Sequence, residues 1–126
     1  MALSTGSDSE PLGVAVGNFD SDSRLDIAVV NFRACDVMVF VRYRSQPFLS
    51  MTTYSTGNES RPQPMAIANV NNDYCLDIIV ANYGNDNIGV LFGYGNGTFM
   101  DQTVYTTGNG SKPCYVAVGD FTNDSW

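Results

Sequence analysis

The sequence has no histidine, only six lysines and arginines, and no apolar stretch long enough to be a transmembrane helix. Histidine is the most common general acid or base in enzymes, and the chain shows no other catalytic constellation. We therefore expect that the protein is not an enzyme. The formal net charge of -7 argues against binding to nucleic acid, and no membrane insertion is expected. A cation is the partner that this charge balance favours.

Cysteine is also scarce, with three residues at Cys35, Cys75 and Cys114. No C-x-x-C pair is present, which excludes an ordinary structural zinc site. An odd count also argues against a simple disulfide framework. We expect all three to be free thiols, because the arrangement described below separates them too widely to pair.

The residues that are abundant favour β-structure. Tyr, Phe, Thr and Val suit strands, whereas Asn and Gly suit tight turns. No window repeats apolar residues at helical spacing, so we predict an all-β fold. No signal peptide is visible in the polar start of the sequence, which predicts either an intracellular protein or a piece of a longer one.

The chain repeats itself. The segment NFDSDSRLDIAVVN begins at Asn18 and NVNNDYCLDIIVAN begins at Asn69, so the offset is 69 − 18 = 51 residues. A third copy, DFTNDSW, begins at Asp120, and 120 − 69 is again 51. This predicts a single repeat region over 1–126 with units at about 1–51, 52–102 and a truncated 103–126.

Each unit is predicted to hold four short strands. In the middle copy these are 64–70, 78–82, 88–94 and 98–105, with a tight Gly95–Gly97 hairpin before the last. Four antiparallel strands in about fifty residues are typical of a β-propeller blade, which gives two full blades and about half of a third. The alternative is a sandwich with a duplicated sheet.

The polar loop of each unit is a candidate calcium site. Calcium takes six to eight oxygen ligands in irregular geometry, and oxygen-bearing residues recur here at alternate positions. Three carboxylates in one short loop would also repel one another without a cation. The first loop offers Asn18, Asp20, Asp22, the carbonyl of Arg24, and Asp26; the second offers Asn69, Asn71, Asp73, the carbonyl of Cys75, and Asp77.

The two loops are not expected to bind equally. The second has one carboxylate fewer and should bind more weakly, and the third, Asp120 to Trp126, lacks its last ligand position. An EF-hand is excluded, because its sixth and twelfth positions would be Ser23 and Val29, or Tyr74 and Val80. The metal-free alternative is a set of Asx-turns that lead into a strand.

The units resemble FG-GAP repeats, which are grouped with VCBS-type repeats and occur in the head propeller of integrin alpha chains. The matching stretches are VAVGNFDSDSRLDIAVVN, MAIANVNNDYCLDIIVAN and VAVGDFTND. The resemblance implies a calcium loop, D-x-D/N-x-D-G-x-x-D, between the first and second strands of a blade. This chain departs from that pattern at Asn18 and Asn69, and at Ser23 and Tyr74, where a left-handed backbone would strain a residue other than glycine.

The resemblance also implies a function. We expect a calcium-binding adhesion or recognition scaffold, extracellular or at the cell surface, with a protein or carbohydrate ligand. The alternatives are an accessory module of a larger extracellular enzyme and a metal-free structural repeat. Two and a half blades would leave apolar faces uncovered, so we also expect self-association or further blades in a longer native chain.

Overall fold

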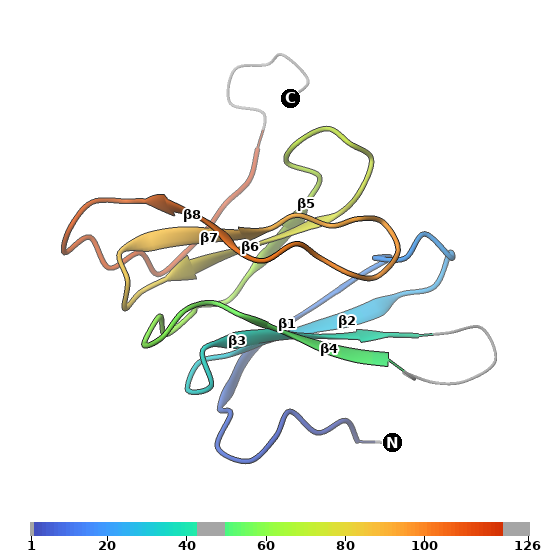
Figure 1. The fold of residues 1–126 in the computed structure, drawn as a ribbon, viewed down its shortest axis with the longest axis horizontal. Helices are drawn as coiled ribbons and strands as arrows, with labels where there is room; N and C mark the ends of the chain where they lie inside the picture. The colour runs from blue at the N-terminus through green and yellow to red at the C-terminus, as the bar shows by residue number, and fades with distance from the viewer. Residues whose placement is uncertain (1, 43–49, 120–126) are drawn as a thin grey trace.

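The computed structural model of the chain describes residues 2–42 and 50–119. These residues form strands and turns, and no helix is present among them (Figure 1). The strands are β1 (Pro11–Gly17), β2 (Asp26–Asn31), β3 (Asp36–Val41), β4 (Ser50–Ser55), β5 (Ala66–Ala68), β6 (Asp77–Asn82), β7 (Asn87–Leu91) and β8 (Thr103–Thr106). The predicted all-β class is therefore confirmed. Within the described ranges no helix is long and apolar enough to cross a membrane.

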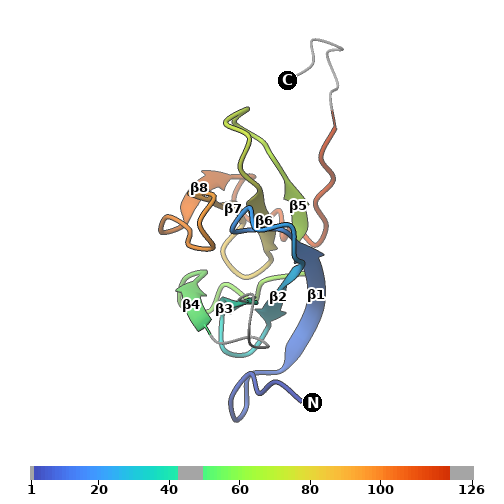
Figure 2. The same cartoon turned by 90° about the vertical axis from the view of Figure 1, so that its right-hand side faces the viewer.

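The strands form two antiparallel sheets of four strands each, in the orders β1-β2-β3-β4 and β5-β6-β7-β8. One sheet lies above the other in Figure 1, and the perpendicular view in Figure 2 keeps them adjacent. Strand order follows chain order, so each sheet is a meander built from local connections. The described residues do not form a closed propeller.

The main core lies between the two sheets. The central strands contribute fully buried side chains to it: Val30, Val37 and Val39 from the first sheet and Ile78, Val80 and Leu91 from the second. All six residues of β6 are buried, which explains why its sequence is apolar without alternation. A smaller cluster of Val29, Met38 and Phe40 lies on the opposite face of the first sheet.

The last predicted strand of the middle unit is wrong at its start. The sequence predicts a strand over 98–105, but β8 begins at Thr103. Phe99 instead turns into the core, where its ring meets Phe19 and Tyr54 edge-on at 5.4 and 5.6 Å between centroids. The backbone around Phe99 still pairs with the segment after β7, because Met100 N donates to the Phe92 carbonyl at 2.8 Å and Phe99 forms an isolated bridge with Gly93. The pairing is then interrupted until β8 begins.

Gln102 holds the same segment in place. Its side-chain Nε2 donates to the carbonyl of Thr56 at 2.9 Å, and its Oε1 accepts from Asn82 Nδ2 at 2.9 Å. Gly89 makes room for this amide, because a Cβ at that position would lie 1.9 Å from Gln102 Oε1. The side chain therefore ties β6 and the end of β4 together.

Candidate metal centre

The two candidate loops occupy the same place in the two sheets. Residues 18–25 join β1 to β2, and residues 69–76 join β5 to β6. This is the connection between first and second strands that the family resemblance implies. The first loop also touches the second sheet, because Ser21 Oγ donates to the carbonyl of Gly95 at 3.2 Å and Gly97 N donates to the carbonyl of Phe19 at 2.9 Å.

In the first loop, two predicted ligands converge on one point. The Oδ1 atoms of Asn18 and Asp20 both accept a hydrogen bond from the Asp22 amide, at 3.1 and 3.2 Å. Asp22 Oδ1 in turn accepts from the Arg24 amide at 2.9 Å. The backbone thus draws the side-chain oxygens of positions one and three together on the inside of the turn.

The second loop repeats most of this arrangement. Asn69 Oδ1 accepts from the Asp73 amide at 3.1 Å, and Asp73 Oδ1 accepts from the Cys75 amide at 2.9 Å. The third position differs: Asn71 Oδ1 is buried and has no hydrogen-bond partner. A buried oxygen without a donor is costly, and a bound cation would relieve that cost.

The backbone is left-handed at the fourth and sixth positions of both loops. The φ angles are 63° and 71° at Ser21 and Ser23, and 60° and 66° at Asn72 and Tyr74. The predicted left-handed conformation at the sixth position is therefore confirmed in a chain that has no glycine there. Tyr74 is 93% exposed, so its ring meets little steric hindrance although the backbone remains strained.

The ninth-position aspartates do more than the sequence predicted. Asp26 and Asp77 are fully buried. Asp26 accepts from the amides of Phe19 and Arg42, at 3.0 and 2.8 Å, and Asp77 accepts from those of Val70 and Gly93, both at 2.9 Å. Each carboxylate therefore clamps the start of its loop to the end of the third strand. Each oxygen keeps a second lone pair for a cation.

The pKa values of two neighbouring carboxyls in the first loop, Asp20 and Asp22, are shifted in opposite directions. Burial raises the pKa of the Asp20 carboxyl, and contact with the Asp22 carboxyl and the charge of Asp26 raise it further. The Arg24 amide lowers the pKa of Asp22. Two neighbouring carboxyls, one resisting ionisation and one favouring it, are an arrangement that a divalent cation stabilises.

The donor set suits calcium more than a transition metal. Nowhere in residues 2–42 and 50–119 do three or more His, Cys, Asp or Glu side chains form a group that could hold a metal ion. A site in these loops would therefore depend on amide and carbonyl oxygens as well as carboxylates, as calcium permits. The features that favour such an ion lie in different loops: the neighbouring carboxyls of Asp20 and Asp22 in the first, and the orphaned oxygen of Asn71 in the second.

Two further predictions concern the cysteines and the third loop. All three cysteines are free, as expected. Burial and the charges of Asp73 and Asp77 raise the pKa of the Cys75 thiol. The third loop, Asp120 to Trp126, lies outside the described residues.

A family of known proteins matches the part of the chain that contains the second loop. The FG-GAP-like repeat family matches residues 69–126, a stretch that starts at the first position of the second loop. The chain therefore contains a repeat of the FG-GAP type, and the resemblance seen in the sequence is confirmed. No match was found among curated proteins or among solved structures.

Proposed function

We propose that the chain is a calcium-binding segment of a β-propeller that serves as an adhesion or recognition scaffold and performs no catalysis itself. The observation that carries the proposal is the convergence of the Asn18 and Asp20 side-chain oxygens on one backbone amide, that of Asp22, on the inside of the first loop. Two oxygens held together in this way offer a calcium ion a preformed pair of ligands. The orphaned oxygen of Asn71 gives independent support in the second loop.

Calcium would be held by the side-chain oxygens and carbonyls of each loop. The first would use Asn18, Asp20, Asp22 and Asp26 with the carbonyl of Arg24; the second would use Asn69, Asn71, Asp73 and Asp77 with the carbonyl of Cys75. The bound ion would supply positive charge that fixes the loop. Because the first loop contacts Gly95 and Gly97, an ordered first loop would also hold the turn that follows β7 in the second sheet.

The repetition of local geometry supports the blade interpretation. The left-handed residues Ser21 and Ser23 recur at Asn72 and Tyr74, and 72 − 21 and 74 − 23 are both 51. The clamp made by Asp26 recurs at Asp77 with the same two kinds of amide. Two sheets of four strands that pack face to face are what consecutive blades would form.

The outer face of the first sheet supports a requirement for further blades or copies. On the first sheet, the register places Val16, Ile27, Phe40 and Met51 in one row across the strands. Val16 and Met51 are 57% and 52% exposed. Burial of such a row contributes roughly 25 cal/mol per Å² of apolar area, so we propose that the chain self-associates or continues in a longer protein. Light scattering at several concentrations tests self-association. A sharp monomer mass throughout, together with a cooperative thermal transition, would mean that the chain covers its own ends and would contradict both parts of the proposal.

The scaffold role and its ligand rest on the family resemblance. We propose an extracellular or cell-surface setting and a protein or carbohydrate ligand. The accessory-module alternative predicts a catalytic domain in the same polypeptide, which flanking sequence would reveal. The metal-free alternative predicts no response to calcium.

Thermal unfolding with calcium or EDTA tests the metal site. For a Kd of about 10⁻⁴ to 10⁻³ M, 10 mM calcium should stabilise the folded state by about 1.4–2.7 kcal/mol. That corresponds to a rise in Tm of about 5–10 °C for a chain of this size. Magnesium is the matched control ion, because it demands a stricter octahedral geometry. Identical melting curves in calcium and EDTA would refute the proposal.

A matched pair of variants distinguishes the loops. Asp22 and Asp73 make the same hydrogen bond, from the amide two residues later at 2.9 Å, so Asp22→Ala and Asp73→Ala have similar structural costs. We expect the calcium-dependent gain to fall more in Asp22→Ala, because the first loop has more carboxylates. An equal or larger fall in Asp73→Ala would contradict the assignment of ligands. Asp26 is a poor choice here, since its clamp supports the fold without metal.

A further inference from the structure

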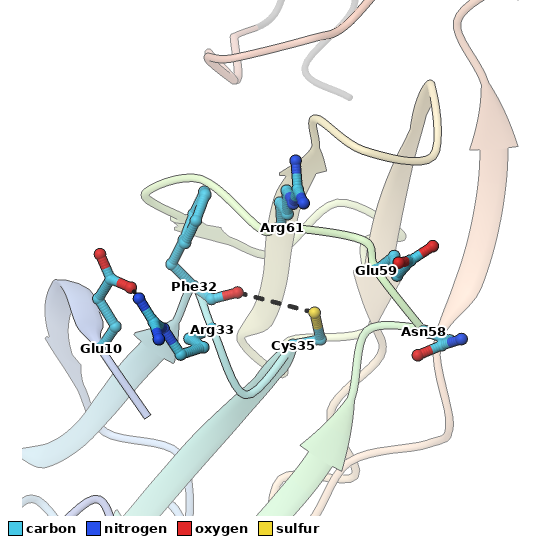
Figure 3. Close-up of a pocket in the computed structure, with 7 residues that line it drawn as sticks. All are labelled: Glu10, Phe32, Arg33, Cys35, Asn58, Glu59 and Arg61. Carbon is cyan, nitrogen blue, oxygen red and sulfur yellow. Dashed lines mark hydrogen bonds and ion pairs between the residues drawn. The ribbon is translucent and has the colours of Figure 1, made fainter. Parts of the chain in front are cut away.

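A cavity of about 420 Å³ opens at the end of the strands opposite the candidate metal loops. It lies between the turn that joins β2 to β3 and the segment that follows β4 (Figure 3). Its volume is within the range of small-molecule sites. The lining residues are Glu10, Phe32, Arg33, Cys35, Asn58, Glu59 and Arg61.

The corresponding place one unit later is filled by a carboxylate of the chain itself. Asp86 Oδ2 accepts from the Gly110 amide at 2.8 Å, and Asp86 Oδ1 accepts from the Lys112 amide at 2.9 Å. These two hydrogen bonds lower the pKa of Asp86. A pair of backbone amides in this conformation therefore forms a recess that selects a carboxylate.

The turn at the cavity has the same backbone conformation, but the position equivalent to Asp86 is Cys35, which has no carboxylate. Cys35 stands 51 residues before Asp86 (86 − 35 = 51), and both are left-handed, with φ of 58° and 54°. Their carbonyls accept from Thr56 and Thr107, each at 3.0 Å. The two turns therefore meet the following segment in the same way.

The amides equivalent to those of Gly110 and Lys112 belong to Glu59 and Arg61 (110 − 51 = 59 and 112 − 51 = 61). Among the described residues, neither amide donates a hydrogen bond to protein. The thiol of Cys35 is directed instead to the carbonyl of Phe32, at 3.7 Å. Two amides without a protein acceptor thus belong to residues that line the cavity, at the place where the next unit has a carboxylate.

The charges around the cavity tolerate an anion. Arg33 forms ion pairs with Asp8 and Glu10 at 3.7 and 3.1 Å, so its positive charge is already offset by two carboxylates. Arg61 forms no ion pair within the described parts of the chain. In Figure 3 its side chain rises from the segment that carries the two amides. The lining therefore balances two acidic with two basic residues in a chain whose net charge is -7.

We propose that this cavity binds a carboxylate group of another molecule, with the Glu59 and Arg61 amides donating to its two oxygens and the Arg61 guanidinium offsetting its charge. The ligand would be a small organic acid or the free carboxyl terminus of a peptide. Both sources present the same planar group that Asp86 presents one unit later. This site is separate from the metal loops and does not depend on calcium.

The test uses isothermal titration calorimetry on the full chain in EDTA, with acetate as the first probe and chloride as the control salt. A group this small should bind with a Kd on the order of 1–10 mM. A tripeptide with a free carboxyl terminus and the same peptide with an amidated terminus distinguish the two sources. Binding of acetate alone assigns a small acid, and binding of the free-terminus peptide alone assigns a peptide end; either supports the site.

Variants of Cys35 make the test specific. Cys35→Asp should fill the recess from within, as Asp86 does, and weaken probe binding at least tenfold while raising Tm. Cys35→Ser, which adds no carboxylate, should bind as the natural chain does, and Arg61→Gln should bind several-fold more weakly.

If Cys35→Asp fails to fold, NMR shifts of the Glu59 and Arg61 amides on addition of acetate to the natural chain decide the matter. Absence of binding or of those shifts at 50 mM probe, or undiminished binding by a folded Cys35→Asp variant, would overturn the proposal.

Discussion

Asp26→Asn is the substitution whose effect follows most directly from the structure. The carboxylate is fully buried and accepts from the amides of Phe19 and Arg42 at 3.0 and 2.8 Å. Asparagine keeps the shape and one accepting oxygen, but it turns an NH₂ group toward one of the two amide donors. The charge that strengthens both hydrogen bonds is lost as well.

The expected cost can be built from these two contacts. A hydrogen bond to a charged acceptor contributes about 1.5–3 kcal/mol, and a buried donor left without a partner costs about 1–3 kcal/mol. One bond is lost and the other is weakened, so we expect the free energy of unfolding to fall by about 2–4 kcal/mol. Total stability for a domain is about 5–15 kcal/mol, so a large part of it depends on this side chain.

The assay is urea denaturation followed by circular dichroism, carried out in EDTA so that no metal contributes. Asp101→Asn is the matched control, because Asp101 is exposed and the chemical change is identical. A surface change of this kind should stay within about 0.5 kcal/mol. If Asp26→Asn is no more destabilising than the control in EDTA, the carboxylate is not a clamp, and its role would be limited to ligation.

Three other expectations concern packing and charge. Phe99→Ala should destabilise the fold by about 3–4 kcal/mol in urea denaturation, since this buried ring fills the space between the sheets; a loss below 1 kcal/mol would mean that the site collapses freely. Gly89→Ala should also destabilise, because its Cβ would lie 1.9 Å from Gln102 Oε1, and the double variant with Gln102→Ala should lose less than the sum of the single effects. Additive losses would place the clash elsewhere. Asp86 has a lowered pKa because the Lys112 and Gly110 amides stabilise its charged form, so the stability it contributes is present above the unfolded pKa of about 4 and lost as pH falls through the folded value. Asp86→Asn should flatten the fall in Tm over that acidic window, and an unchanged pH profile would exclude this cause.

Local sequence determined the elements of this protein that depend on short-range pattern. The 51-residue spacing placed both polar loops before the buried strands β2 and β6, where the structure has them. The left-handed backbone at Ser23 and Tyr74 was implied by the family resemblance, because the family pattern has glycine at that position. These features depend on residues within one loop or one strand, so they can be predicted from the sequence alone.

Only the tertiary structure decided which groups meet across the sheets. Asp26 sits at a ligand position in the sequence, but its hydrogen bond to Arg42 spans 16 residues and exists because β2 pairs with β3. The backbone of Phe99 bridges to Gly93 as a strand residue would, but the rings that its side chain meets, Phe19 and Tyr54, depend on how the sheets pack. The amides opposite Cys35 lie beyond β4 in the chain. Side-chain pattern specifies which face a residue buries, whereas its partners depend on how whole sheets pack, and that packing is a property of the assembled fold.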